Sequence, residues 1–151
     1  MQPGDIGYLT FLHGRLYAAE FGWDYTFEAY VAGPLSEFAK SRGEREQIWI
    51  VERDGLVSGS IAIVAASEDE AQLRWLLLHP DLRGKGLARI LMEEALAFCR
   101  EHGYQRVFLW TESRLVNAAA LYRIFGFQLT YEKKHELWGD QVEEHRYELN
   151  L

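Results

Sequence analysis

The segment from Leu82 to Met92, LRGKGLARILM, places two glycines and three cations directly before an apolar run. Glycine lets the backbone come close to a ligand, and the first turn of a helix offers N–H groups that have no partner within the helix. Arg83, Lys85 and Arg89 add local positive charge to a chain whose net charge is −7. We therefore predict an anion site, and a pyrophosphate suits it. A glycine-rich connection solvated by its own charges is the alternative.

Two common nucleotide-binding motifs are absent. The Walker pattern G-x-x-x-x-G-K-[ST] does not occur, and G-x-G-x-x-G fails because Arg89 stands where the third glycine belongs. The loop therefore fits neither an ordinary nucleoside triphosphatase nor a dinucleotide-binding enzyme.

Two other motifs carry a family resemblance. The loop reads R-x-x-G-x-A through Arg83, Gly86 and Ala88, and the segment from Leu121 to Phe127 reads L-Y-x-x-x-G-F. Both motifs, in this order, resemble the GNAT superfamily of N-acetyltransferases. The resemblance covers nearly the whole chain. It implies acetyl-CoA as cosubstrate, with its pyrophosphate in the loop, and no metal.

A narrower resemblance concerns bacterial proteins that fuse a MarR-type helix-turn-helix to an acetyltransferase half. The segments HGRLYAAEFGWD (13–24), HELWG (135–139) and RYEL (146–149) look like that acetyltransferase half. The DNA-binding half is absent from this sequence. We therefore expect a stand-alone relative, and regulation of transcription does not follow.

The resemblance assigns roles to individual residues. The backbone of Leu76, Leu77 and Leu78 would pair with the pantetheine arm as an added strand would. Tyr122 would lie near the sulfur and protonate the leaving thiolate, because a phenol near pKa ~10 and a thiol near ~8.5 are close enough for useful proton transfer. A packed helix aromatic is the alternative for Tyr122. The pyrophosphate would accept hydrogen bonds from the backbone of the loop residues Arg83, Gly84, Lys85, Gly86, Leu87, Ala88 and Arg89.

One position departs from the family pattern. Family members commonly carry a cofactor-contacting asparagine seven residues before the tyrosine, and Leu115 stands there in this chain. Either Asn117 substitutes for it after a local shift, or Asn117 only caps or solvates the start of the helix.

Direct transfer also needs a group that takes a proton from the amine. Glu112, after a strand beside the expected cofactor slot, is our candidate base, and His13, Glu20 and Asp24 are further possibilities. Each is equally open to a role as cap, surface group or substrate contact. We expect an acceptor pocket shaped by His13, Glu20, Trp23 and Trp110, with Trp75 more suited to the core. Neither Cys/His metal-ligand spacing nor a G-x-S-x-G nucleophile motif occurs, so we expect neither a metal site nor a covalent serine enzyme.

Length and composition limit the number of domains, the partners and the compartment that we expect. A chain of 151 residues with 48 % apolar and 14 % aromatic residues predicts one domain, residues 1–151, around a single core. The net charge of −7 argues against nucleic acid and anionic membranes as partners. Cys99 is the only cysteine, so we expect a buried, inert thiol in a reducing compartment. No leader or long apolar run is visible, which predicts a cytoplasmic protein.

The first part of the chain is predicted to be helical. Asp5 to Leu9 is a possible edge strand, and Phe11 to Phe21 has helical spacing that ends at Gly22. Asp24 is the expected N-cap of a second helix, with Pro34 as a kink or break.

The middle of the chain alternates between strand and turn signals. Gln47 to Glu52 and Leu56 to Ala65 predict a hairpin around Asp54-Gly55. The nearly continuous apolar run from Gln72 to His79 predicts a central strand that is covered on both faces.

A crossover and a last pair of strands complete the predicted elements. Leu87 to His102 has an amphipathic helical pattern, Arg106 to Thr111 reads as a strand, and Leu115 to Phe125 reads as a short helix. Phe127 to Leu137 and Val142 to Leu149 predict an antiparallel pair. The order strand, helix, strand, helix indicates a parallel crossover.

We therefore predict an α/β (α+β) fold of the GNAT type, a mixed, mostly antiparallel, splayed sheet flanked by about four helices. The expected reaction is acetyl transfer from acetyl-CoA to a primary amine of a small molecule or a protein. A catalytically silent acyl-CoA-binding sensor is the alternative, and a DNA-linked regulator is disfavoured by the charge. The family resemblance also favours a homodimer through the late strands.

Overall fold

The computed structural model describes residues 1–151 and contains four α-helices, one 3-10 turn (η1) and six strands. The predicted order of helices and strands is confirmed, apart from the first few residues. Along the chain the elements are α1 (Asp5–Phe21), α2 (Tyr25–Ser41), β1 (Gln47–Arg53), β2 (Leu56–Ala65), β3 (Glu70–Leu78), η1 (Pro80–Leu82), α3 (Leu87–Glu101), β4 (Arg106–Glu112), α4 (Val116–Ile124), β5 (Gln128–Leu137) and β6 (Asp140–Asn150).

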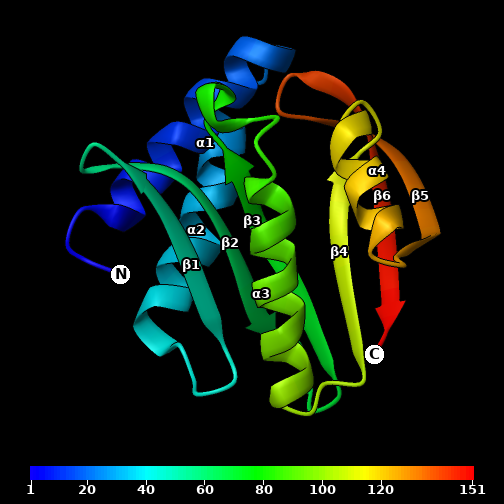
Figure 1. Cartoon of the computed structure of the whole chain (residues 1–151). Helices are drawn as coiled ribbons and strands as arrows, with labels where there is room; N and C mark the ends of the chain where they lie inside the picture. The colour runs from blue at the N-terminus through cyan, green and yellow to red at the C-terminus, as the bar shows by residue number, and fades with distance from the viewer.

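The strands form one sheet in the order β1-β2-β3-β4-β6-β5 (Figure 1). Every neighbouring pair is antiparallel except β3 and β4, which are parallel and joined through α3. That parallel pair is short: Glu70, Ala71 and Gln72 pair with Arg106, Val107 and Phe108, and the two strands then diverge. The predicted splayed, mostly antiparallel sheet is confirmed.

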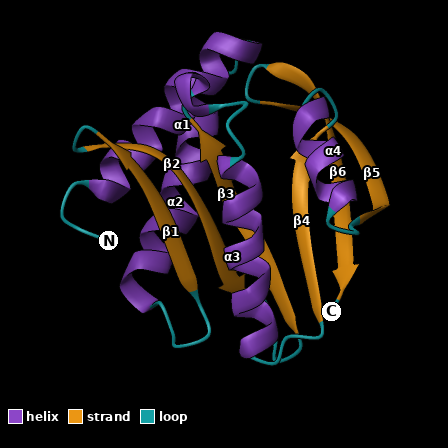
Figure 2. Ribbon diagram, in the orientation of Figure 1, coloured by secondary structure: helices purple, strands orange, loops and turns teal.

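Helices cover both faces of this sheet, as Figure 2 shows. One core lies on the side of α3 and α4 and contains Leu91, Met92, Leu96 and Tyr122. The other lies on the side of α1 and α2 and contains Leu9, Phe27 and Leu35. Because β3 contributes to both cores, the prediction of a central strand covered on both faces is confirmed.

An extra residue in β3 reverses the order in which its side chains alternate between the two faces of the sheet. Ser60 and Ala62 on β2 face Leu77 and Arg74 on β3, so three steps on β3 oppose two on β2. Trp75 sits in this bulge with φ of 51°, and its carbonyl accepts a hydrogen bond from the buried Ser60 hydroxyl at 2.6 Å. As a result Ala71 and Leu73 contact the α3 side, whereas Trp75 and Leu77 contact the α1–α2 side.

Two expectations for the first part of the chain are wrong. The predicted edge strand from Asp5 to Leu9 is the first turn and a half of α1, because Leu9 joins Leu12 and His13 on a buried helical face. Of the kink or break expected at Pro34, the break is wrong, because α2 runs without interruption to Ser41. Buried residues on both sides of the proline, Phe27, Val31, Leu35 and Phe38, hold the helix against the sheet and outweigh the lost hydrogen bond.

The remaining local predictions hold. Asp24 caps α2 by accepting a hydrogen bond from Thr26 N at 2.9 Å. The β1–β2 turn places Asp54 and Gly55 at φ of 52° and 77°, as an Asp-Gly hairpin requires. Cys99 is buried, and burial raises the pKa of its thiol to about 12. None of the helices combines the length and the apolar character needed to cross a bilayer.

Candidate active site

A cleft of about 910 Å³ opens where β3 and β4 diverge. Its walls come from α1, α2, both diverging strands, the loop before α3 and the start of α4. Residues that are far apart in sequence therefore meet around one opening, which is large enough for a ligand of substantial size. Most of the predicted site residues line it.

The loop before α3 has the predicted geometry for an anion. Gly84 and Gly86 have φ of 74° and 78°, and a side chain at either position would meet nothing within 4 Å. Gly86 is the N-cap of α3, and no side chain caps the N–H groups that follow it. The backbone donors of Leu87, Ala88 and Arg89 are thus available at the mouth of the cleft, and these residues fit a pyrophosphate.

The cations of this loop differ in what they contact. Arg83 donates from Nε to Leu78 O at 3.2 Å and forms an ion pair with Glu20 of α1 at 2.7 Å. Arg89 pairs with Glu93 one turn further along α3. Lys85 is exposed and does not line the cleft. Arg83 therefore ties the loop to the opposite wall, and Glu20 serves as its counter-ion.

The edge of β3 that faces β4 is unpaired beyond Gln72. Leu76, Leu77 and Leu78 lie along this stretch and line the cleft. Backbone groups on an unpaired strand edge are ready to pair with an extended ligand. The structure thus provides the strand edge that the predicted pantetheine contact requires.

Tyr122, on α4, lines the cleft and is 5 % exposed. Its ring packs near Phe127 and Tyr147, while no protein group hydrogen-bonds its hydroxyl. Burial, and then the neighbouring phenols of Tyr17 and Tyr147, raise the pKa of Tyr122 well above its usual value. The premise that the phenol keeps an ordinary pKa is therefore wrong, because the ionised form loses water without gaining a donor.

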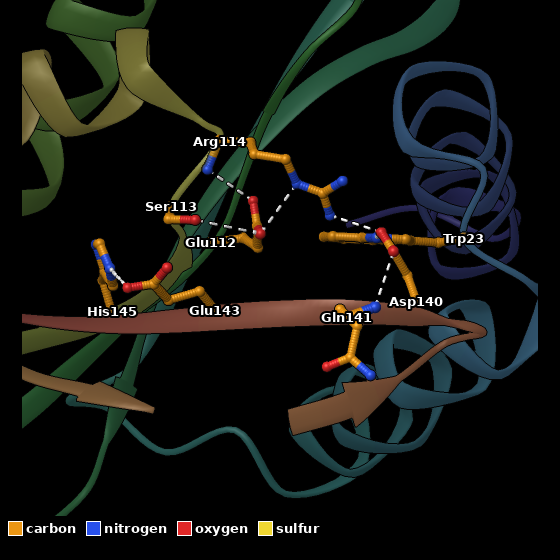
Figure 3. A network of polar contacts seen from close by, with 8 residues as sticks. All are labelled: Trp23, Glu112, Ser113, Arg114, Asp140, Gln141, Glu143 and His145. Atoms are coloured by element: carbon orange, nitrogen blue, oxygen red, sulfur yellow. Dashed lines mark hydrogen bonds and ion pairs between the residues drawn. The ribbon is translucent and has the colours of Figure 1, made fainter. Parts of the chain in front are cut away.

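Glu112 ends β4 and belongs to a polar network at the rim of the cleft (Figure 3). Its carboxylate is 5 % exposed and accepts hydrogen bonds from Arg114 N at 2.7 Å and Arg114 Nε at 3.0 Å, with a longer one from Ser113 Oγ at 3.4 Å. Each carboxylate oxygen has two lone pairs, so one on Oε2 is left for a water or an amine.

Arg114 joins this carboxylate to two other parts of the chain. Its Nη2 donates to Asp140 Oδ2 at 2.7 Å, and the Trp23 indole donates to the same oxygen at 3.2 Å. The guanidinium also lies over the ring of Phe21 at 4.8 Å. The network thereby connects the end of β4, the α1–α2 connection and the β5–β6 turn, and Arg114 was not among the predicted site residues.

His13 is 3 % exposed on α1 and lines the cleft. Its Nδ1 lies 2.8 Å from Leu9 O, which makes Nδ1 the protonated nitrogen and leaves the lone pair on Nε2. Burial lowers the pKa of His13 to about 4. The imidazole is therefore neutral at pH 7, and it is able to accept a hydrogen bond from a ligand.

The predicted tryptophans and Asn117 also reach the cleft, whereas Asp24, a further candidate base, does not line it and caps α2 instead. Trp23 stacks on Tyr17 with ring centroids 5.2 Å apart, and Trp110 is half-buried against Tyr131. Trp75 lines the cleft as well, although it packs mainly against Phe38. Asn117 is exposed in the first turn of α4 and lines the cleft, while Leu115 is the N-cap.

Three possible metal ligands lie elsewhere, on the β5–β6 hairpin. Glu132, Glu143 and His145 bring one ligand atom each within 4.8 Å of one another. They do not line the cleft, and His145 Nε2 already contacts Glu143 at 3.2 Å. No sequence spacing reveals them, because the turn between the two strands creates their proximity.

Comparison with known proteins places this geometry in a family. The model of the Acetyltransferase (GNAT) family matches residues 14–127. The uncharacterized N-acetyltransferase YjgM of Escherichia coli is 41% identical over 83 residues, which is 53% of this chain and 50% of that protein. The chain thus aligns with about half the length of YjgM.

Solved structures share the fold at low sequence identity. An acetyltransferase from Streptococcus agalactiae superposes with a TM-score of 0.77 and 20% identity over 100% of this chain and 94% of that one. The yncA structure from Salmonella typhimurium, which holds its cofactor acetyl-CoA, has a TM-score of 0.66 and 18% identity over 80% of this chain and 73% of that one. The matching family model, the shared fold and the loop before α3 lead to one conclusion: the chain belongs to the Acetyltransferase (GNAT) family.

Proposed function

We propose that this protein is an N-acetyltransferase that moves the acetyl group of acetyl-CoA to a primary amine by direct attack. The observation that carries the proposal is the uncapped start of α3, with Gly84 and Gly86 at positive φ, opening directly onto the unpaired edge of β3. A pyrophosphate and an extended pantetheine arm need these two features side by side.

Each part of the cosubstrate has a candidate partner. The N–H groups at the start of α3 would hold the pyrophosphate, and the free edge at Leu76 to Leu78 would pair with the amides of the pantetheine arm. A backbone N–H next to the bulge at Trp75 would polarise the thioester carbonyl. The acceptor would then approach from the α1–α2 side, where His13, Trp23 and Trp110 line the cleft.

The reaction transfers one acetyl group and releases one proton. A base takes a proton from the acceptor ammonium, and the neutral amine attacks the thioester carbon. The new C–N bond forms, the C–S bond breaks, and the thiolate takes up a proton to give CoA. The attached nitrogen loses its second proton, which restores the group that protonated the thiolate. We assign proton removal to Glu112, directly or through a water on the remaining Oε2 lone pair, and protonation of the thiolate to Tyr122, whose hydroxyl is free in the cleft.

Two other classes of function compete. A catalytically silent acyl-CoA sensor would use the same loop and strand edge without turnover. A DNA-linked regulator would need a cationic surface, whereas this chain carries a net charge of −7. The narrower resemblance to MarR-type fusions, and a homodimer through the late strands, stay predictions.

The first test is calorimetric titration with acetyl-CoA. Gly86→Glu adds a carboxylate and a side chain at φ of 78° where the pyrophosphate would sit, so binding should be lost. Gly103→Glu is the matched control, since Gly103 has φ of 76°, open surroundings and a place at the far end of α3. Equal binding by the wild type and Gly86→Glu, or no binding by the wild type, would contradict the proposal.

Turnover then separates the enzyme from the sensor. Tyr122→Phe keeps the ring packing and removes the hydroxyl, so we expect kcat to fall about 100-fold with unchanged acetyl-CoA affinity. The measurement is CoA release over a broad panel of amines. Tight binding without turnover by the wild type would favour the sensor, and an unchanged kcat in Tyr122→Phe would remove the acid role.

A further inference from the structure

One arginine in the cleft has no acidic partner. The guanidinium of Arg74, on β3, lies over the Trp75 indole 4.8 Å from the ring centroid, with the Tyr30 phenol beside it. No carboxylate of the protein lies within ion-pair distance of it. The other three arginines that line the cleft all have one: Arg83 pairs with Glu20, Arg89 with Glu93, and Arg114 with Glu112 and Asp140.

The environment of Arg74 favours an anionic ligand. Its side chain is half-buried, and burial lowers the pKa of the guanidinium, which nevertheless stays charged. A cation that is partly removed from water loses hydration, and a neutral phenol does not replace it. The guanidinium lies over the indole and beside the Tyr30 phenol, and its N–H groups that Tyr30 does not use remain to bind a carboxylate through two hydrogen bonds.

The position of Arg74 brings such an anion close to the reacting atoms. Arg74 immediately precedes the bulge at Trp75 and the free edge at Leu76 to Leu78. At ~3.3 Å per residue, its Cα lies roughly 7 Å along the strand from that of Leu76. Its contacts with Trp75 and Tyr30 place its head on the α1–α2 side, from which the acceptor enters.

The cleft also offers an acidic group for the amine. Burial raises the pKa of the Tyr30 phenol, and Glu144 on β6 adds to this shift. Glu144 lines the same cleft, and its Oε1 also contacts His135 Nε2. A positive pole at Arg74 and a negative one at Glu144 therefore flank Tyr30. This arrangement complements a small zwitterion, and a single cation matches a carboxylate better than a doubly charged phosphate.

We propose that Arg74 binds the carboxylate of the acceptor, and that the acceptors are free α-amino acids. The inference rests on the proposed acetyltransferase function. In an α-amino acid one carbon separates the amine from the carboxylate, so a carboxylate held by Arg74 keeps the amine near the thioester. The products would be an N-acetyl amino acid, CoA and one proton.

The test compares L-amino acids with their amides, which keep the amine and lose the negative charge. Across a panel of such pairs, led by phenylalanine because aromatic rings line the cleft, we expect kcat/KM for the preferred acid to exceed that of its amide about tenfold or more. Arg74→Gln should remove this preference by lowering kcat/KM for the acid about tenfold more than kcat/KM for the amide. Arg74→Lys should restore part of it, and the surface variant Arg106→Gln should change neither rate.

Two outcomes would overturn the inference while leaving the enzyme intact. In the first, the wild type acetylates acids and amides equally well. In the second, Arg74→Gln lowers both rates by the same factor, which would make Arg74 a structural residue.

Binding separates this inference from the proposed function. If acetyl-CoA binds and no amine is acetylated, the enzymatic proposal fails. Calorimetric titration of the CoA complex with the same pairs then decides the carboxylate site. Binding of an amino acid that is lost in Arg74→Gln supports it, and absence of any amino-acid binding to the wild type overturns it.

Discussion

His13 shows how one buried side chain links the cleft to the stability of the fold. Its imidazole is neutral in the folded protein because burial lowers its pKa from 6.5 to about 4. The unfolded chain takes up a proton below pH 6.5 and the folded protein does not. The contribution of His13 to the free energy of unfolding is therefore complete above pH 6.5 and is lost as the pH falls towards 4.

This gives a prediction for His13→Gln. Between pH 7.5 and pH 5 the wild type should lose about 2 kcal/mol of unfolding free energy through this group, and the variant should not. Urea unfolding at several pH values measures the difference in slope. His102→Gln is the matched control, because its Nδ1 makes the same contact with a carbonyl four residues back, Phe98 O, from a half-exposed position.

The change in unfolding free energy with pH, and not its absolute value, decides this prediction. A loss of stability that is the same at every pH would reflect packing alone. Parallel pH curves for the wild type and His13→Gln would show that His13 is protonated in the folded protein.

At the scale of the elements, the bulge in β3 precedes the strand edge that we propose to pair with the cosubstrate. The Ser60 hydroxyl satisfies the Trp75 carbonyl inside the bulge and is 0 % exposed. Ser60→Ala should cost about 1–3 kcal/mol of unfolding free energy, since it leaves a buried carbonyl without a partner. It should also raise the KM for acetyl-CoA by disturbing Leu76 to Leu78.

A neighbouring serine provides the control. Ser58 is also buried on β2, and its hydroxyl donates to Leu56 O at 3.0 Å, away from the bulge. Ser58→Ala should lower the melting temperature without a change in KM. An unchanged KM in Ser60→Ala would show that the bulge keeps its shape without this hydrogen bond.

Much of the fold could be predicted because its signals are local. The Asp54-Gly55 turn, the Asp24 cap and the Gly86 start of α3 each depend on a few adjacent residues. Asp5 to Leu9 was misread because a short apolar stretch fits a strand or a helix equally, and only contacts with distant residues decide between them. Of the two possibilities at Pro34, a kink or a break, the break does not occur, because packing against the sheet holds the helix together and cannot be seen in the sequence.

Some residues of the candidate site could be predicted from local sequence, and others could not. The phosphate loop and Tyr122 carry recognisable motifs, whereas Arg74 and Arg114 do not. Two of the groups that Arg114 contacts, Phe21 and Asp140, lie far from it in the sequence. Arg74 stands out only because no carboxylate of the protein pairs with it. The bulge at Trp75, which turns Trp75 and Leu77 towards the α1–α2 side, has no signature in a run of apolar residues.

For the whole molecule, the short parallel pairing of β3 and β4 means that a bound cosubstrate would add to the stability of the fold. The two halves of the sheet share three paired positions there, and a bound pantetheine arm would bridge the rest. At one hundred times its Kd, acetyl-CoA should stabilise the protein by about 2.7 kcal/mol. In calorimetric melting, acetyl-CoA should raise the Tm of the wild type and leave the Tm of Gly86→Glu unchanged. The same increase in both proteins would show that acetyl-CoA binds elsewhere.

The bulge at Trp75 also has a consequence for insertions and deletions. Because it adds one residue to β3, the parity of the strand changes at that point: odd-numbered residues face α3 before it and the acceptor side after it. Substitution of Trp75 leaves the number of residues in β3 unchanged. Deletion of any one residue in the bulge would exchange the faces of everything on one side of it. At this point, the number of residues in β3 matters more to the arrangement than which residues they are.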